Sequence, residues 1–126
     1  MRILHFVSNI RISNGVMNVI MNYYRNINRK KIQFDFLYFD EFDTKTFKDE
    51  IIYLGGEIYK IKRPQISLKC KKEIYSFFNE KKGKYQVLHI HEVFLAPLLI
   101  NAAKSKEPLI TIIHVHTTVF GKNIRS

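Results

Sequence analysis

PLITIIHVHTT, at Pro108–Thr118, is a run of β-branched and apolar residues that ends in two histidines and two threonines. A similar stretch, YQVLHIHE, stands upstream at Tyr85–Glu92. Short apolar runs of this kind are typical of strands buried inside a parallel sheet. Open α/β sheets bind ligands at the carboxyl ends of such strands. The two stretches therefore predict a parallel sheet with a binding site at one edge.

Strand-like and helix-like patterns alternate along the whole chain. Strands are predicted at Arg2–Ser8, Ile32–Phe39, Gly56–Ile61, Val87–His91 and Leu109–Val115. The strand residues expected in the core are Leu4, Phe6, Phe36, Leu88 and Ile112. Helices are predicted between them, from Asn14 and Gly15 to near Asn28, and at Thr46–Leu54, Lys69–Lys82 and Phe94–Lys104. Ser13 or Asn14 is suited to cap the first helix, and the pair Gly55–Gly56 is suited to end the second. Pro97 is tolerated only in the first turn of the last helix.

This alternation predicts the fold class: α/β, a Rossmann-like, doubly wound parallel sheet of about five strands in a single domain, residues 1–126. In the strand order 3-2-1-4-5, the first and fourth strands flank the point where the order reverses and a ligand crevice opens. The segments Ser8–Gly15, His89–Glu92 and His114–Thr118 then lie along one edge of the sheet. We expect the ligand there, with Glu92 among the residues that bind it.

Composition excludes several classes of protein. The chain has 126 residues, 46% of them hydrophobic, which suits one globular domain rather than a disordered segment. Its single cysteine, Cys70, cannot form a disulfide within the chain and fits a reducing compartment. The first apolar run is too short for a signal peptide or a membrane span. We therefore expect a cytoplasmic protein.

The charge of the chain favours anionic partners. A total of 21 Lys and Arg against 11 Asp and Glu gives a net charge of +10. No Arg-rich arm, zinc-finger spacing or aromatic RNA-binding motif occurs, so no nucleic-acid partner is expected. The segment Ser67–Tyr85 combines six lysines with Phe77 and Phe78, which suits peripheral contact with an anionic membrane at its inner face. The alternative is an ordinary solvated helix face with both phenylalanines in the core.

The loop Ser8–Gly15 leads from the first strand into a helix whose free N–H groups favour an anion such as a phosphate. It holds one glycine, so it contains neither the dinucleotide fingerprint nor a P-loop. A capped turn explains Asn14 and Gly15 equally well. Both interpretations of the loop stay open.

Histidines close the last two predicted strands. His89 and His91 share one face of a strand. His114 and His116 do the same on the next strand, about 4.8 Å away, which permits a metal cluster. No cysteine accompanies them and the spacings differ from those of zinc motifs, so we expect no metal and no cofactor. Imidazoles can instead stabilise a developing negative charge or exchange a proton, whereas His5, in the first strand, is expected to be packed.

Five stretches, taken in order, resemble a known family. They are RILHFVSNIRISNGVMNVIMNYYRNI, QFDFLYF, LGGEIYKI, VLHIHE and ITIIHVHTT. Together they resemble the N-terminal, acceptor-side domain of retaining glycosyltransferases of the GT-B fold, of the type found in bacterial capsular and exopolysaccharide biosynthesis. The resemblance covers essentially the whole chain. It implies transfer of a sugar from a nucleotide-sugar donor to a glycan or lipid-linked acceptor.

The resemblance implies roles for residues near the first and fourth strands. Asn14 and Gly15 match the family's glycine pair in the loop that approaches the donor diphosphate, with Asn in place of the first glycine. His89 and His91 match the histidines that close the fourth strand, although Gln86 stands where an aspartate is usual. All four matched residues are thereby implied to bind substrate.

The resemblance also implies roles beyond the fifth strand. His114 matches the histidine that family members place near the transferred sugar and the acceptor, which implies a catalytic role. The polar run beyond it is matched by His116, Thr117 and Thr118, implied to bind substrate.

Family members have a second, C-terminal domain that holds the donor, and their first domain has further strands. Neither follows Ser126, so the chain is expected to be a truncated N-terminal domain that is inactive alone. Two alternatives stay open. One is a non-catalytic Rossmann-like module that binds a sugar or nucleotide, and the other is a metal-binding protein built on the histidine cluster.

Overall fold

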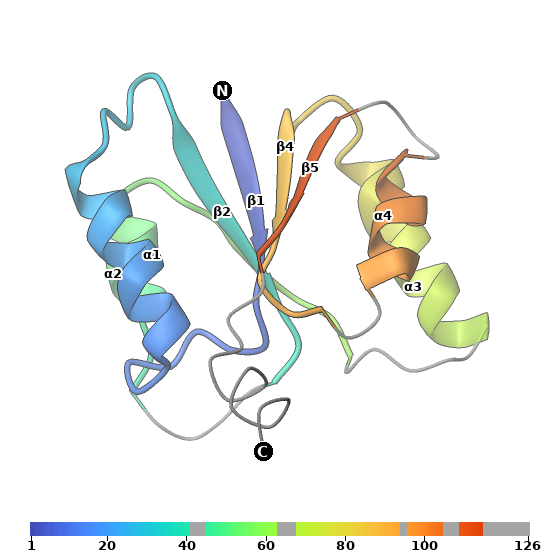
Figure 1. Cartoon of the computed structure of the whole chain (residues 1–126), viewed down its shortest axis with the longest axis horizontal. Coiled ribbons are helices and arrows are strands. Elements are labelled where there is room, and N and C mark those ends of the chain that lie inside the picture. Colours follow the sequence, from blue (N-terminus) through green and yellow to red (C-terminus); the bar gives the residue numbers. More distant parts are fainter. Residues whose placement is uncertain (41–44, 63–67, 94–95, 105–108, 115–126) are drawn as a thin grey trace, which may run out of the picture.

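The computed structural model describes residues 1–40, 45–62, 68–93, 96–104 and 109–114 (Figure 1). The strands are β1 (Arg2–Phe6), β2 (Gln33–Tyr38), β3 (Ile58–Lys60), β4 (Val87–Ile90) and β5 (Ile110–Ile113). The helices are α1 (Gly15–Asn26), α2 (Lys48–Tyr53), α3 (Leu68–Glu80) and α4 (Ala96–Lys104). These elements alternate along the described chain, in the order that the hydrophobic pattern predicts.

All strands run parallel in one sheet, in the order β3-β2-β1-β4-β5. Helices α1 and α2 lie on one side of this sheet, and α3 and α4 lie on the other (Figure 1). Both the predicted fold class and the predicted strand order are confirmed. The order reverses between β1 and β4, so the carboxyl ends of these two strands mark the place where this kind of sheet binds ligands.

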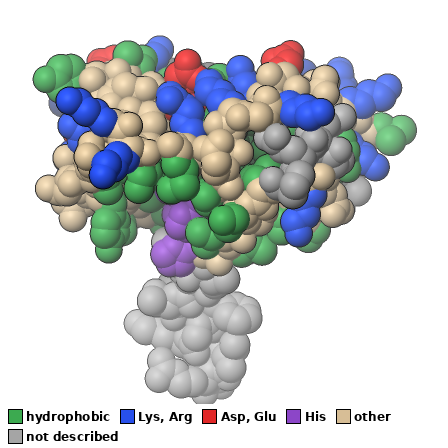
Figure 2. All heavy atoms as spheres, turned by 90° about the horizontal axis from the view of Figure 1, so that it is seen from above, with side chains coloured by type: hydrophobic (Ala, Val, Ile, Leu, Met, Phe, Trp, Pro, Cys, Tyr) green, Lys and Arg blue, Asp and Glu red, His purple; other side chains and the backbone are tan. Residues whose placement is uncertain are grey.

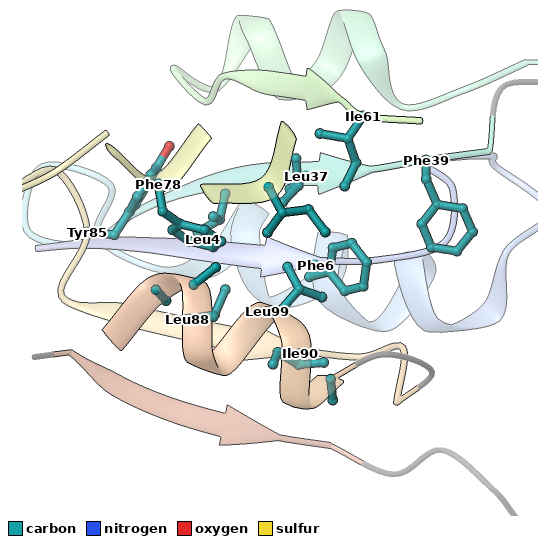
Figure 3. Close-up of a cluster of buried hydrophobic side chains, with 14 residues drawn as sticks. Leu4, Phe6, Leu37, Phe39, Ile61, Phe78, Tyr85, Leu88, Ile90 and Leu99 are labelled. Atoms are coloured by element: carbon teal, nitrogen blue, oxygen red, sulfur yellow. The ribbon is translucent and has the colours of Figure 1, made fainter. Parts of the chain in front are cut away.

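Apolar residues of the central strands are buried on both faces of the sheet. Leu4 and Phe6 of β1 face α3 and α4, in the cluster shown in Figure 3, together with Leu88 of β4. Phe36 of β2 belongs to a second cluster beneath α1 and α2. Complete burial of one such side chain contributes about 1.5–3 kcal/mol to folding. The prediction that these four residues are buried is confirmed.

Local signals set the ends of the helices. Asn14 rather than Ser13 caps α1, because its Oδ1 accepts hydrogen bonds from the amides of Val16 and Met17, at 3.0 and 3.3 Å. Gly55 follows α2 with a φ of 97°, a left-handed conformation that glycine adopts without strain. Pro97 is the second residue of α4, where the lost N–H costs no helical hydrogen bond.

The edge strand β5 differs from the prediction. Ile112 was expected in the core, but 44% of it is exposed, and its neighbours Ile110 and Ile113 are also exposed. Ile112 pairs in register with His89, so it lies on the face that α1 and α2 cover. The buried cluster on that face contains residues of β2 and of the segment after β1 but, among those described, none of β5. The prediction for Ile112 is therefore wrong, because the described helices do not reach over the edge of the sheet.

Candidate functional site

The backbone brings three histidine-bearing segments together at the carboxyl edge of the sheet. His5 of β1 pairs in register with His89 of β4. Beyond the last residue of β4, the amide of His91 donates to the carbonyl of Phe6, at 2.9 Å. Beyond β5, the amide of His114 donates to the carbonyl of Ile90, at 2.8 Å. The parallel ladder thus continues past the strands and aligns these residues side by side.

The imidazoles of His5, His89, His91 and His114 form one group, here called the histidine cluster. The rings of His89 and His91 stack with centroids 4.0 Å apart. His114 stacks on His89 at 5.6 Å and lies 5.7 Å from His91. His5 lies 5.2 Å from His89 and 5.1 Å from His91. The structure therefore joins three of the predicted site histidines to a fourth, His5, that was expected only to be packed.

Burial within the histidine cluster decreases from the core toward the surface. His5 is 4% exposed, so the prediction that it is packed is confirmed. His89 and His91 are half-buried, and His114 is exposed. Figure 2 shows histidine side chains gathered at one place on the surface with hydrophobic side chains beside them. A ligand at this edge would meet His114 first and would reach His5 only through His89 and His91.

His5 and His91 are joined by a hydrogen bond between ring nitrogens, Nδ1 of His5 and Nε2 of His91, 2.9 Å apart. One of the two nitrogens must carry the proton and the other must accept it, so the tautomers of the two rings are linked. Burial, and to a lesser extent the neighbouring His91 and His89, keep the pKa of His5 well below its usual value. His5 is therefore neutral at pH 7.

The loop after β1 is held by asparagines. Asn9 is buried, and its Oδ1 accepts from the Arg11 amide at 3.1 Å and from Asn14 Nδ2 at 3.0 Å. Asn14 Oδ1 in turn occupies the two amides that it caps at the start of α1. These are amides that a bound anion would otherwise use. The capped-turn interpretation of Asn14 is therefore confirmed, and Gly15 beside it is exposed with open space around its α-carbon.

Of the remaining predicted site residues, the structure describes one and leaves three outside the described residues. Glu92 is half-buried and follows His91 directly, at the same edge as the histidine cluster. His116, Thr117 and Thr118 lie outside the described residues. The predicted edge is thus represented by the loop after β1, the end of β4 and the first residue after β5.

A buried carboxylate on the opposite face of the sheet was not predicted. Asp35 is fully buried and accepts hydrogen bonds from Arg2 Nε and Nη2, at 3.0 and 3.1 Å. The Tyr85 hydroxyl and the Glu57 amide also donate to it, at 2.5 and 3.0 Å. The signal in the sequence is an aspartate in the middle of the apolar stretch QFDFLYF. Because these donors satisfy its charge, Asp35 serves stability rather than chemistry.

Three of the imidazoles also have the spacing of a metal-ligand set. One ring nitrogen each of His5, His89 and His91 lies within 4.8 Å of the others. This set differs from the metal cluster that the sequence permits, which consists of four histidines at the ends of the last two strands. It contains His5 and omits His114 and His116.

Comparison with known proteins gives one informative similarity. No family model and no solved structure matches the chain. The chain is 28% identical over 121 residues to the protein named "Putative glycosyltransferase EpsF" of Bacillus subtilis (strain 168). The match covers 93% of this chain and 30% of that protein, so the chain spans less than a third of its length. This similarity supports a relationship with glycosyltransferases, which the sequence motifs also indicate.

Proposed function

We propose that this chain is the acceptor-side domain of a GT-B glycosyltransferase that moves a sugar from a nucleotide-sugar donor to a glycan or lipid-linked acceptor. The observation that carries the proposal is the histidine cluster at the carboxyl ends of β4 and β5. This is the edge at which a sheet of this order binds ligands. The similarity to a protein named as a glycosyltransferase supports the class of reaction.

His114 is the residue to which we assign the principal role. It is exposed, and its ring stacks on His89, which restricts the directions in which it can point. In the transfer, an acceptor hydroxyl forms a bond to the anomeric carbon while the bond to the diphosphate breaks. An imidazole at this position orients the acceptor or sugar hydroxyl by a hydrogen bond. His91, His89 and Glu92 complete the surface on which the acceptor lies.

The loop after β1 is assigned to the donor side. Gly15 is exposed and a side chain there would meet nothing within 4 Å, so a diphosphate can approach its backbone closely. Asn14 shapes this approach through its cap on α1. Hydrogen bonds from such a loop stabilise the charge that develops on the leaving diphosphate. Beyond the described residues, His116, Thr117 and Thr118 are proposed to extend the acceptor surface.

The proposed enzyme includes a donor-binding domain in addition to this chain. The matched relative is more than three times the length of the matched region, which supports this arrangement. We propose that the two parts face each other across the edge where the histidine cluster lies. By itself the chain is expected to bind acceptor without transferring sugar.

Peripheral contact with an anionic membrane is a further part of the proposal. Among the described residues, no helix is both long enough and apolar enough to cross a bilayer. On α3, Lys71 and Lys72 are exposed, whereas Phe78 is buried in the core. This helix therefore offers positive charge without a large apolar wedge, apart from the exposed Leu68 at its start. Contact of this kind would be electrostatic and sensitive to salt.

A chimera tests the proposed function. The matched region of EpsF is replaced by this chain, and release of nucleoside diphosphate from a panel of nucleotide sugars is measured against intact EpsF. We expect the chimera to consume the same donor as EpsF, because the donor-binding part is unchanged. A folded chimera that consumes no donor, while EpsF does, would contradict the proposal and favour a non-catalytic binding module.

A further inference from the structure

We propose that His5, His89 and His91 form a binding site for one divalent transition-metal ion, with Zn²⁺ as the ion that fits best. This site does not depend on the proposed function. It adds the buried His5 to His89 and His91, which are also assigned to the acceptor surface, and it omits His114, which has the principal role in transfer.

The position of the ligands supports a preformed site. His5 lies in β1 and pairs in register with His89 of β4, and His91 directly follows β4. His91 is two residues beyond His89, so it lies on the same face of the sheet. One nitrogen from each ring lies within 4.8 Å of the others, and the nitrogens of His5 and His91 are 2.9 Å apart. A Zn–N bond of about 2.0–2.1 Å places two tetrahedral ligands about 3.4 Å apart. Binding requires the His89 and His91 rings, which stack with centroids 4.0 Å apart, to turn until their nitrogens converge on the ion.

The deepest ligand is held in place by packing. The ring of His5 lies edge-on to Phe34 at 4.3 Å and stacks near Phe36 at 5.4 Å. Because both rings are part of the buried cluster, His5 cannot turn away from His91. In the described structure its Nε2 has no hydrogen-bond partner, so Nδ1 is the nitrogen through which His5 acts. A ligand fixed in this way loses little conformational entropy when a metal binds.

The donor atoms select the class of metal. Imidazole nitrogens suit Zn²⁺, Cu²⁺ and Ni²⁺, whereas Mg²⁺ and Ca²⁺ require oxygen ligands. The three ligands are all imidazoles. Three protein ligands leave a fourth position open for water or another small ligand. That position lies toward the surface, because exposure increases from His5 to His89 and His91.

Metal binding moves a proton within the imidazole rings but does not require either ring to release one. In the structure, one proton lies between His5 Nδ1 and His91 Nε2. When both nitrogens donate their lone pairs to the metal, the ring that carried the shared proton moves it to its other nitrogen, so each ring still holds one proton. The hydrogen bond is therefore replaced by two metal–nitrogen bonds, and both rings stay neutral.

Calorimetric titration of the chain, free of any purification tag and first treated with chelator, tests the proposal. Zn²⁺ is expected to bind one per chain and to raise the melting temperature. Titration with Co²⁺ adds an optical test, because tetrahedral nitrogen ligation gives visible absorption bands. In the unmodified chain, ¹⁵N spectra of the imidazoles should show the largest shifts at His5 Nδ1 and His91 Nε2. Absence of stoichiometric binding would overturn the proposal.

Variants identify the ligands. His91→Gln and His89→Gln are expected to weaken Zn²⁺ binding at least 30-fold, and both sites are half-buried, so the variants should fold. His114→Gln is the matched control, because His114 stacks on the same rings but lies outside the three-ligand set, and it should change the affinity less than threefold. If His114→Gln abolished binding while His91→Gln retained it, the assignment would be wrong.

Discussion

The Tyr85 hydroxyl lies 2.5 Å from Asp35 Oδ2, although 50 residues separate the two in the chain. Tyr85 lies two residues before β4, and Asp35 lies within β2. This hydrogen bond therefore connects β2 to the segment that leads into β4, although these strands are not neighbours in the sheet. Burial and the bond to Asp35 raise the pKa of Tyr85, so its hydroxyl keeps the proton that it donates. The sheet therefore carries a saturated ionic group on one face and, on the other face, the histidine cluster with its buried, neutral His5.

Tyr85→Phe should reduce the free energy of unfolding by about 2 kcal/mol, because a hydrogen bond to a charged group is lost in the interior. Urea unfolding measures the change. Tyr53→Phe is the control, because Tyr53 is 86% exposed and should leave stability unchanged. Equal stability of the two variants would show that Asp35 does not need the Tyr85 hydroxyl.

Asn14→Ala should destabilise the protein by about 1 kcal/mol, the usual effect of losing a helix N-cap. Asn14→Asp keeps the capping oxygen but loses the Nδ2 donor to Asn9, so it should recover only part of the stability lost in Asn14→Ala. Asn22→Ala, on the exposed face of α1, serves as the control and should not destabilise. Thermal and urea unfolding of the three variants are compared, and a loss in Asn14→Asp equal to that in Asn14→Ala would argue against the cap.

The metal-free protein should lose stability as the pH falls below neutrality. Unfolded His5 takes up a proton near pH 6.5, whereas burial lowers its folded pKa well below that value. Between the two pKa values the unfolded state binds more protons, so the free energy of unfolding decreases as the pH decreases. Melting temperatures measured in chelator from pH 7.5 to 5 should show this slope.

His5→Gln should flatten that slope, because the titrating ring is removed. His114→Gln should retain it, because His114 is exposed and does not share the burial of His5. If the slope were the same in His5→Gln as in the original chain, another group would be responsible.

Contact of α3 with membranes can be tested by co-sedimentation with liposomes of increasing anionic lipid content. Binding should appear at low salt and weaken at high salt, since each lysine near an anionic surface contributes about 1 kcal/mol. Replacement of Lys71, Lys72, Lys81 and Lys82 by Gln should abolish it. The control replaces four exposed lysines near α1 and α2 by Gln, which removes the same amount of charge elsewhere on the protein: Lys30, Lys31, Lys45 and Lys48. Equal loss in both variants would indicate attraction by net charge alone.

In the chimera with EpsF, His114→Ala should lower kcat by about 10²–10⁴-fold if the imidazole acts on the transition state. The measurement is steady-state kinetics at saturating donor. Ile113→Ala, at the exposed preceding position, is the control for a general effect on β5. A change of less than threefold in His114→Ala would remove this residue from the catalytic site.

The parts of this structure that depend on local pattern could be predicted from the sequence. Alternating strand and helix signals predict the parallel sheet. Asn14 could be named, beside Ser13, as a candidate cap because its capping bonds reach only the nearby amides of Val16 and Met17. The bond between His5 and His91 could not, since it joins residues 86 positions apart and depends on register. The exposure of Ile112 could not be predicted either, because an apolar strand has the same pattern at the centre and at the edge of a sheet.

The exposed isoleucines of β5 affect how the chain behaves in solution. β5 pairs with β4 on one side, and among the described residues no strand pairs with its other side. An apolar strand edge of this kind is a template for the addition of another chain. The net charge of +10 opposes such self-association, so the balance depends on ionic strength. Dilute protein at low salt should therefore remain monomeric, whereas concentrated protein at high salt should assemble through β5.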